Sequence, residues 1–306
     1  MIIDKLAKRI TELNNPTVVG LDPRFENLPE HIRAEAIKNY GETPKAAAEA
    51  FYEFNRVIID NVCDIVPAVK PQIAFYEQYG ADGIDAYQRT INYAKQNGLI
   101  VIGDIKRGDI ASTASAYSDG HIGRVKVGET SRAIFDEDFI TVNPFLGYDA
   151  IEPFLKNCAE YDKGLFVLVK TSNASSRDVQ DLPVNGAPLY EEVARLVGEW
   201  GKAFIGECGY SSIGAVVGAT FPEQIKKIRG IIPHVFFLVP GYGAQGASAV
   251  DIMDCFDEKK LGAVVNNSRQ IIFAYSNEKY KNDFSEKNFG LAARRACLDM
   301  KEELLR

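Results

Sequence analysis

The sequence contains few of the residues from which metal sites and disulfide frameworks are built. Its 306 residues include three histidines and five cysteines, and no two cysteines form a C-x-x-C pair. An odd number of isolated cysteines argues against a disulfide framework and against a zinc ribbon. The histidines lack the H-E-x-x-H and facial-triad spacings of metal enzymes. We therefore expect reduced thiols and no protein-held transition metal.

Long apolar runs are also missing. No stretch approaches the roughly 18 apolar residues that span a membrane, and residues 1–10 lack the apolar core of a signal peptide. The net charge of −7 provides no general attraction to nucleic acid, so a phosphate-bearing ligand requires a local cluster of donors. We therefore expect a soluble cytoplasmic protein with no membrane or nucleic-acid partner.

The chain does contain a series of short apolar strands, nearly all followed by a helical segment. The expected strands are residues 17–21, 68–73, 99–104, 139–142, 165–169, 215–219, 234–239 and 262–266. This alternation has no break in composition and predicts an α/β fold, a single (β/α)8 TIM barrel over residues 1–306. Residues 24–42 are expected to be irregular, and the long polar loop that ends near residue 187 is a candidate lid.

A dense cluster of opposite charges stands at the end of the third expected strand. Asp104 and Lys106 are two residues apart, which predicts that their side chains share one face of the strand. Asp109 follows after a glycine that can turn the chain sharply. Such charges are costly to desolvate and must be paired, so the cluster indicates either a structural ion pair or a catalytic site.

Polar residues gather where the other expected strands end. In TIM barrels the carboxyl ends of the strands hold the active site. The residues at these ends are Asp22, Lys70, Asp104, Lys106, Asn143, Ser172, the segment 240–245 and Arg269. Their convergence favours a catalytic use of the charge cluster over a purely structural one.

The glycine-rich segment at residues 241–246 matches the pattern G-x-G-x-x-G between a strand and a helix. A dinucleotide fold needs an acidic residue at the end of the next strand, where this chain has Asn-Asn-Ser-Arg, so a nicotinamide dehydrogenase is disfavoured. A glycine loop after the seventh strand and an arginine after the eighth fit the phosphate site of barrels instead. Gln245 can donate an amide hydrogen bond and Arg269 a bidentate one. A simple tight turn and a solvated arginine are the alternatives.

Together these motifs resemble the orotidine 5'-phosphate decarboxylases, and among them the longer bacterial subgroup. The most specific match is Asp104-Ile-Lys106-Arg-Gly-Asp109-Ile with Thr113, which fits the family pattern D-x-K-x-x-D-I and a threonine four residues on. Lys70 and Asp22 stand where the family's strand-2 lysine and strand-1 aspartate belong. Ser172 is similar to the serine that touches the pyrimidine. The segment Pro240-Gly-Tyr-Gly243-Ala-Gln245-Gly and Ser268-Arg269 resemble its phosphate-binding segment.

The resemblance implies decarboxylation of orotidine 5'-phosphate to uridine 5'-phosphate, the last step of pyrimidine nucleotide synthesis, with no cofactor and no metal. It implies a homodimer in which Asp109 and Thr113 reach the neighbouring subunit's site. The catalytic residues that it implies are Lys70, Asp104, Lys106 and Asp109. The substrate-binding residues that it implies are Asp22, Thr113, Ser172, Pro240, Gly243, Gln245 and Arg269. Compared with compact members of the family, residues 24–43, 114–138 and 173–187 are expected to be insertions.

Loss of CO2 from C6 of the pyrimidine leaves a carbanion with little resonance relief, and the chain has no motif for an electron-sink cofactor. We expect the Lys106 ammonium to stabilise the carbanion and donate the proton, while carboxylates hold that lysine charged and oriented. One alternative is a Mg-dependent sugar-phosphate decarboxylase, which would carry an additional acid where this chain has Lys70-Pro71. Another is a non-catalytic barrel that binds nucleotide phosphates, which has no need of four charged residues.

Overall fold

The computed structural model describes residues 1–243 and 248–305. Eight parallel strands are hydrogen-bonded in the order β1-β12-β11-β10-β7-β6-β3-β2 of a closed barrel, which confirms the expected fold class. The chain forms two compact units, one of residues 1–16 and 106–266 and one of residues 17–105 and 267–306. The expectation of one domain over the whole chain stays a prediction.

The unit of residues 17–105 and 267–306 carries the first three barrel strands. Its elements are β1 Thr17–Leu21, η1 Phe25–Asn27, α2 Glu30–Tyr40, α3 Pro44–Val62, β2 Ala68–Pro71, α4 Ala74–Glu77, α5 Gly80–Gln96, β3 Ile100–Arg107 (which runs into the other unit), α11 Arg269–Ile272, η5 Ala274–Ser276, η6 Glu286–Asn288 and α12 Phe289–Leu305. The strands β1, β2 and β3 pair in parallel, with Val18 beside Ala68 and Ala68 beside Ile100. Both faces of these strands are buried, as their continuous apolar runs predict.

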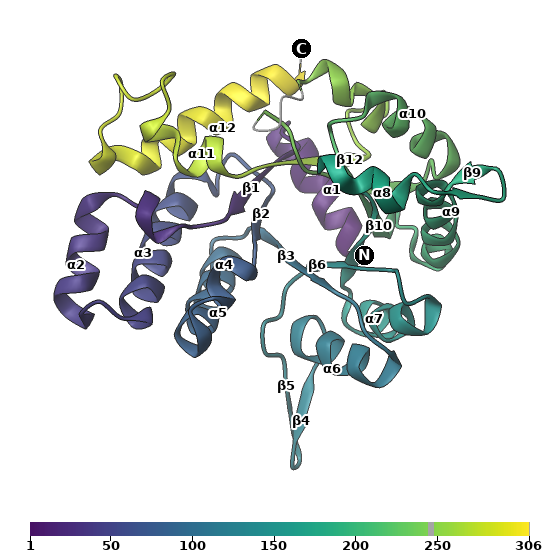
Figure 1. The fold of residues 1–306 in the computed structure, drawn as a ribbon, viewed down its shortest axis with the longest axis horizontal. Helices are drawn as coiled ribbons and strands as arrows, with labels where there is room; N and C mark the ends of the chain where they lie inside the picture. The colour runs from purple at the N-terminus through teal and green to yellow at the C-terminus, as the bar shows by residue number, and fades with distance from the viewer. Residues whose placement is uncertain (244–247, 306) are drawn as a thin grey trace. The chain divides into compact units, whose positions relative to one another are not determined.

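One segment of this unit corrects the sequence interpretation. Residues 24–42 are not irregular, because they contain η1 and the helix α2, which packs alongside α3 (Figure 1). Only Ile32 and Ala36 of α2 are buried, so its apolar residues are too sparse to give a helical period. Gly41, with φ of 69°, ends the helix in a conformation that glycine adopts readily.

The unit of residues 1–16 and 106–266 carries the remaining barrel strands. Its elements are α1 Ile2–Leu13, α6 Ala111–His121, β4 Val125–Val127, β5 Thr130–Arg132, β6 Phe139–Val142, α7 Tyr148–Tyr161, β7 Gly164–Lys170, η2 Ala174–Ser176, α8 Arg177–Gln180, β8 Pro183–Val184, β9 Ala187–Pro188, α9 Leu189–Gly201, η3 Lys202–Phe204, β10 Ser211–Val217, α10 Pro222–Ile231, β11 Val235–Val239, η4 Val250–Cys255 and β12 Ala263–Asn267. The strands β6, β7, β10, β11 and β12 pair in parallel in that order.

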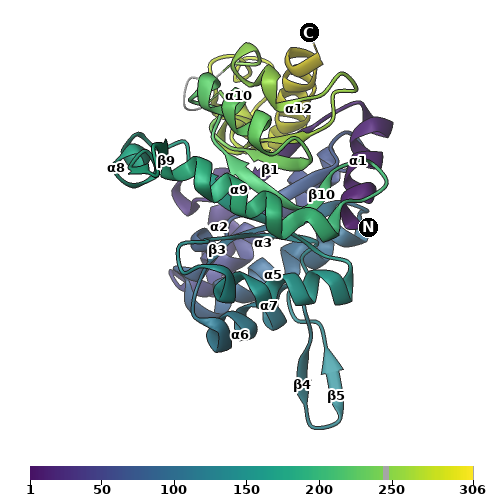
Figure 2. The same cartoon turned by 90° about the vertical axis from the view of Figure 1, so that its right-hand side faces the viewer.

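Two of the expected insertions fall in this unit. Residues 114–121 belong to α6, and the antiparallel pair of β4 and β5 follows as a hairpin that extends beyond α6 and α7 (Figure 2). Residues 173–187 hold the short elements η2, α8 and β8 together with the start of β9. Within the described part of the chain, no helix is long and apolar enough to cross a membrane.

Candidate functional site

A lysine between two carboxylates stands at the ends of β1, β2 and β3. Lys70 Nζ lies 2.6 Å from Asp104 Oδ2 and 4.0 Å from Asp22 Oδ1. The side chains of Lys70 and Asp104 are 5% and 8% exposed, so water screens their attraction little. Parallel pairing of β2 with β3 brings the two residues together, although they are 34 positions apart in the sequence.

The charges of this group keep the lysine protonated. Burial by itself lowers the pKa of Lys70, because an isolated ammonium is poorly solvated inside a protein. The negative charges of Asp104 and Asp22 and the hydrogen bond to Asp104 outweigh burial and raise the pKa above its ordinary value. Lys70 is therefore a fixed cation that holds Asp104 in place at neutral pH.

A buried hydrogen-bond chain, which the sequence pattern did not reveal, supports the end of β1. Tyr76 Oη donates to the carbonyl oxygen of Leu21 at 3.2 Å, and Asn55 Nδ2 donates to Tyr76 Oη at 2.8 Å. Leu21 is the residue before Asp22, so this chain fixes the backbone that carries that carboxylate. Asp22 Oδ1 is buried without a hydrogen-bond partner among the described residues, which leaves it free to accept a bond from a ligand. The sequence feature that could have revealed this chain is Asn55, an amide on the apolar face of α3.

Lys106, two residues after Asp104, has an unusual backbone. Its φ is 46°, in the left-handed region that costs a non-glycine residue of order 1–3 kcal/mol. Its backbone N–H donates to Thr141 Oγ1 of β6 at 2.9 Å, which helps to hold this conformation, and its side chain is exposed. Strand alternation does not hold at such a residue, so the shared face of Asp104 and Lys106 stays a prediction.

The last residue of β3 is hydrogen-bonded to the first residue after β6. The backbone N–H of Asn143 donates to the carbonyl oxygen of Arg107 at 2.8 Å. Gly108 lies so close that a Cβ there would come within 2.7 Å of the Asn143 carbonyl oxygen, which explains the glycine. Asp109 Oδ1 accepts the backbone N–H of Ile110 at 2.7 Å just before α6, and Thr113 lies exposed in the first turn of that helix. Their expected roles stay predictions.

The end of β7 holds Ser172 and an ion pair that the sequence did not reveal. The carbonyl oxygen of Ser172 accepts Thr220 Oγ1 at 3.3 Å. Lys170, the last residue of β7, is fully buried, and its Nζ lies 2.6 Å from Asp181 Oδ1. Residues 173–187, expected to be a lid, are thus tied to the strand from which they leave.

The expected phosphate-binding segment is described only in part. The carbonyl oxygen of Pro240 accepts the backbone N–H of Ala219 at 2.9 Å. Gly241 and Gly243 have φ of 95° and 69°, which explains glycine at both positions. Gln245 lies outside the described residues. Arg269 is exposed and is the first residue of α11.

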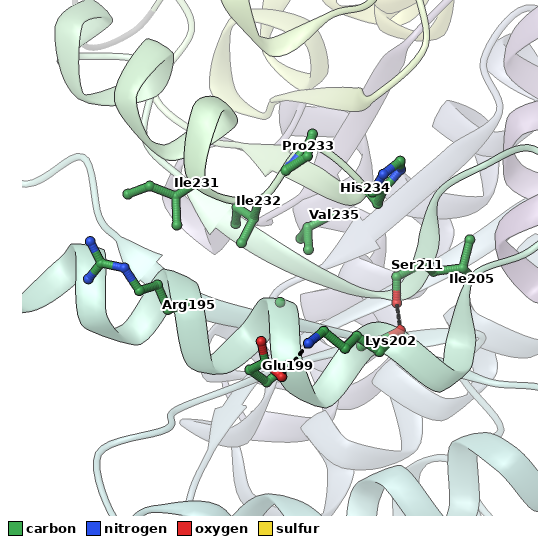
Figure 3. A pocket seen from close by; sticks show the side chains of 12 residues that line it. Arg195, Glu199, Lys202, Ile205, Ser211, Ile231, Ile232, Pro233, His234 and Val235 are labelled. Carbon is green, nitrogen blue, oxygen red and sulfur yellow. Dashed lines mark hydrogen bonds and ion pairs between the residues drawn. The ribbon is translucent and has the colours of Figure 1, made fainter.

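A cavity lies at the amino ends of β10 and β11, at the opposite end of these strands from Gly218 and Pro240. It is lined by residues of α9, η3 and α10 and by Ser211 and Val235, the first residues of the two strands (Figure 3). Its volume of about 240 Å³ is below the roughly 300–1,000 Å³ of most small-molecule sites. Two of its charged residues, Glu199 and Lys202, pair with each other at 2.6 Å. We assign it no catalytic role.

Comparison with known proteins gives consistent matches over nearly the whole chain. The model described as the Orotidine 5'-phosphate decarboxylase / HUMPS family matches residues 19–281. A relative from Rhodopirellula baltica, named orotidine 5'-phosphate decarboxylase, is 44% identical over 300 residues, 98% of this chain and 97% of the relative. A relative of the same name from Caldicellulosiruptor bescii is 44% identical over 290 residues, 94% of this chain and 93% of the relative. The solved structure of Leishmania donovani OMP decarboxylase has a TM-score of 0.73 and 29% identity, over 100% of this chain and 99% of that one.

Proposed function

Since the chain belongs to the orotidine 5'-phosphate decarboxylase / HUMPS family, and its reaction is the decarboxylation of orotidine 5'-phosphate, we propose that Lys106, Asp104 and Lys70 carry out this step. The product is uridine 5'-phosphate, so the enzyme is a carboxy-lyase of pyrimidine nucleotide synthesis. The observation that supports the assignment of residues is the buried Lys70 ammonium between Asp104 and Asp22.

The reaction breaks the bond between C6 of the pyrimidine and its carboxylate carbon. CO2 leaves without the bonding electrons, which remain on C6. The ammonium group of Lys106 stabilises this negative charge and then transfers a proton to C6, and water later returns a proton to the neutral amine. Lys106 follows Asp104 by two residues, so a fixed Asp104 restricts where the chain can place this amine.

Asp104 stands beside the departing carboxylate in this proposal. Lys70 holds it at 2.6 Å, so it cannot turn away when a second negative charge arrives. Release of CO2 disperses that second charge and relieves the repulsion. Asp22 Oδ1, which has no hydrogen-bond partner among the described residues, accepts a ribose hydroxyl.

The other substrate contacts follow the family resemblance. Ser172 meets the pyrimidine, and Pro240, Gly243, Gln245 and Arg269 receive the phosphate dianion, Arg269 as a charge-assisted donor. Phosphate binding energy is then used to position the base, which lies far from the phosphate itself.

We also propose a homodimer in which each active site contains residues of both subunits. Asp109 and Thr113 reach the partner's site, and apolar side chains around these loops offer a surface for the second subunit. Four large apolar residues of the loops after β3 and β6 and of the start of α7 are at least 48% exposed: Ile110, Phe145, Leu146 and Tyr148. We also propose a cytoplasmic location, in keeping with five free thiols and no disulfide among the described residues.

A Mg-dependent sugar-phosphate decarboxylase is the second candidate, since the family description covers more than one activity. Such an enzyme needs a metal-binding acid at the end of β2, where Lys70 stands instead and occupies Asp104 with its ammonium. A barrel that only binds nucleotides gains nothing from an ammonium and carboxylates buried at such cost.

The test is the absorbance change of orotidine 5'-phosphate with the purified chain, before and after treatment with a chelator. We expect turnover to uridine 5'-phosphate that the chelator leaves unchanged. No change in absorbance, or complete loss of turnover with the chelator, would overturn the proposal. Orotidine without its phosphate should react far more slowly, because it lacks the binding energy of the dianion.

A further inference from the structure

The Lys170–Asp181 pair joins the last residue of β7 to the loop of residues 173–187. Lys170 is fully buried, and its Nζ lies 5.5 Å from the ring centre of Tyr190 and 5.1 Å from that of Phe221. These aromatic faces attract a cation only weakly, so the carboxylate of Asp181, 2.6 Å away, provides the main compensation for its charge. The loop must therefore stay on the strand for Lys170 to remain paired.

A second connection stands one residue further on. The backbone N–H of Thr171 donates to Gln180 Oε1 at 3.0 Å, and Gln180 Nε2 donates back to Thr171 Oγ1 at 2.9 Å. Adjacent loop residues, Gln180 and Asp181, thus bind adjacent strand-end residues, Thr171 and Lys170. Two neighbouring contacts fix the orientation of the loop relative to the strand as well as its distance from the strand.

The end of β7 and the next residue, Ser172, are also hydrogen-bonded to residues that follow β10. The carbonyl oxygen of Lys170 accepts the backbone N–H of Gly218 at 2.8 Å, and that of Ser172 accepts Thr220 Oγ1 at 3.3 Å. A Cβ on Gly218 would come within 2.8 Å of Ser172 Cα, so the two backbones are in close contact. Ser172 therefore sits between a fixed strand end and a fixed loop.

We propose that Lys170 and Asp181 are positioning residues, which lock residues 173–187 onto the end of β7 and so set the place of Ser172 against the pyrimidine. This inference rests on the proposed function, because it takes Ser172 as a contact to the base. It replaces the expectation of a free lid with a loop that is held closed before substrate arrives. Preorganisation of this kind lowers the entropy lost when substrate binds.

The chain offers a control at the other end of the same strand. Lys163, the residue before β7, is also a buried lysine, and its Nζ lies 2.7 Å from Asp136 Oδ1 and 3.9 Å from Asp138 Oδ1. The carboxylates of Asp136 and Asp181 are 42% and 35% exposed, so water can solvate the nearest anion that removal of either lysine leaves behind. Lys163→Met and Lys170→Met therefore make the same chemical change at opposite ends of β7, and only the second touches the loop.

The first readout is steady-state kinetics with orotidine 5'-phosphate. For Lys170→Met we expect KM to rise roughly 10- to 100-fold with a much smaller change in kcat, because a binding contact is misplaced. Lys163→Met should keep the wild-type KM. The double variant Lys170→Met/Asp181→Leu, which leaves no buried charge, should show the same rise in KM, and Asp181→Glu, which keeps the negative charge, should keep most of the affinity.

The second readout needs no activity. Arg177 is exposed within the loop, so cleavage after it by trypsin reports release of the loop from the strand. We expect faster cleavage in Lys170→Met and Lys170→Met/Asp181→Leu than in the wild type and Lys163→Met. Unchanged cleavage would overturn the locking role, and faster cleavage with an unchanged KM would overturn the positioning role. A wild-type chain without decarboxylase activity would instead overturn the proposed function, while the cleavage comparison would still test the lock.

Discussion

Lys70 Nζ lies 2.6 Å from Asp104 Oδ2, and both side chains are almost completely buried. A second carboxylate, Asp22, stands 4.0 Å from the same ammonium. One cation is thus shared by two anions, which leaves this group of three side chains with one excess negative charge. This excess suits a reaction in which a substrate carboxylate must leave as a neutral molecule.

Removal of Asp104 should reveal how strongly this pair is coupled. Asp104→Asn leaves a buried ammonium without its close partner, and such a loss costs about 3–5 kcal/mol of unfolding free energy. The double variant Lys70→Met/Asp104→Leu should regain much of that stability, because neither charge remains, yet have no activity. Urea unfolding measures the first effect. Equal stability of the single and double variants would contradict the coupling.

Lys106 should be needed for chemistry and not for folding. Lys106→Ala should lower kcat by at least about 10²- to 10⁴-fold, the usual contribution of a proton donor. Its side chain is exposed, so the thermal unfolding midpoint should stay near the wild-type value. Lys126→Ala, at an exposed lysine of β4, is the control and should keep full activity. Wild-type kcat in Lys106→Ala would exclude Lys106 as the donor.

Shared sites predict recovery of activity between two inactive variants. When equal amounts of Lys106→Ala and Asp109→Ala subunits exchange, half of the dimers are mixed and one of their two sites has both residues. Activity should recover to about one quarter of the wild-type value. Absence of recovery, once mass spectrometry has established that subunits have exchanged, would argue that Asp109 acts within its own subunit.

Replacing Arg229 should lower the free energy of unfolding more than replacing most other residues near the protein surface. Its guanidinium donates to the carbonyl oxygens of Val235, Cys255 and Gly262 at 2.7–2.8 Å and packs 3.6 Å from the ring centre of Phe237. A lysine cannot reach all three oxygens, so Arg229→Lys should lose roughly 2–4 kcal/mol of unfolding free energy. Arg195→Lys, at an exposed ion pair, should lose less than about 1 kcal/mol. Similar losses in both variants would refute this role of Arg229.

The Glu49–Arg89 pair between α3 and α5 should give a measurable pH dependence. The hydrogen bond from Arg89 holds the pKa of Glu49 below its ordinary value of 4.5. A lowered pKa means that the stabilisation is complete above pH 4.5 and is lost as the pH falls through the lowered value. Glu49→Gln should therefore be less stable than the wild type at pH 7, and the difference should shrink in acid. A difference independent of pH would show that charge is not its cause.

The strands could be predicted from the sequence because parallel strands buried on both faces are continuous apolar runs. The expected strand at residues 139–142 coincides with β6, and that at 17–21 with β1. The helix α2 was missed because only two of its residues are buried. Only a narrow stripe of this helix is buried, so it needs few apolar residues and its sequence shows little helical periodicity.

Part of the site could also be predicted from the pattern of strands. Residues that end adjacent parallel strands meet, so Lys70 and Asp104 could be placed together from the strand pattern alone. The left-handed backbone of Lys106 could not be predicted, because a lysine in the sequence gives no indication of a φ of 46°. The contacts of Asp181 and Gln180 with the end of β7 could not be predicted either, because these residues belong to a polar loop with no periodic pattern.

The most direct test of the account compares the wild type and Lys106→Ala on orotidine 5'-phosphate in the same metal-depleted buffer, with the product separated by chromatography. We predict stoichiometric uridine 5'-phosphate and CO2 from the wild type and at most a trace from the variant. Equal product from both proteins, or none from the wild type until a divalent metal is added, would contradict it.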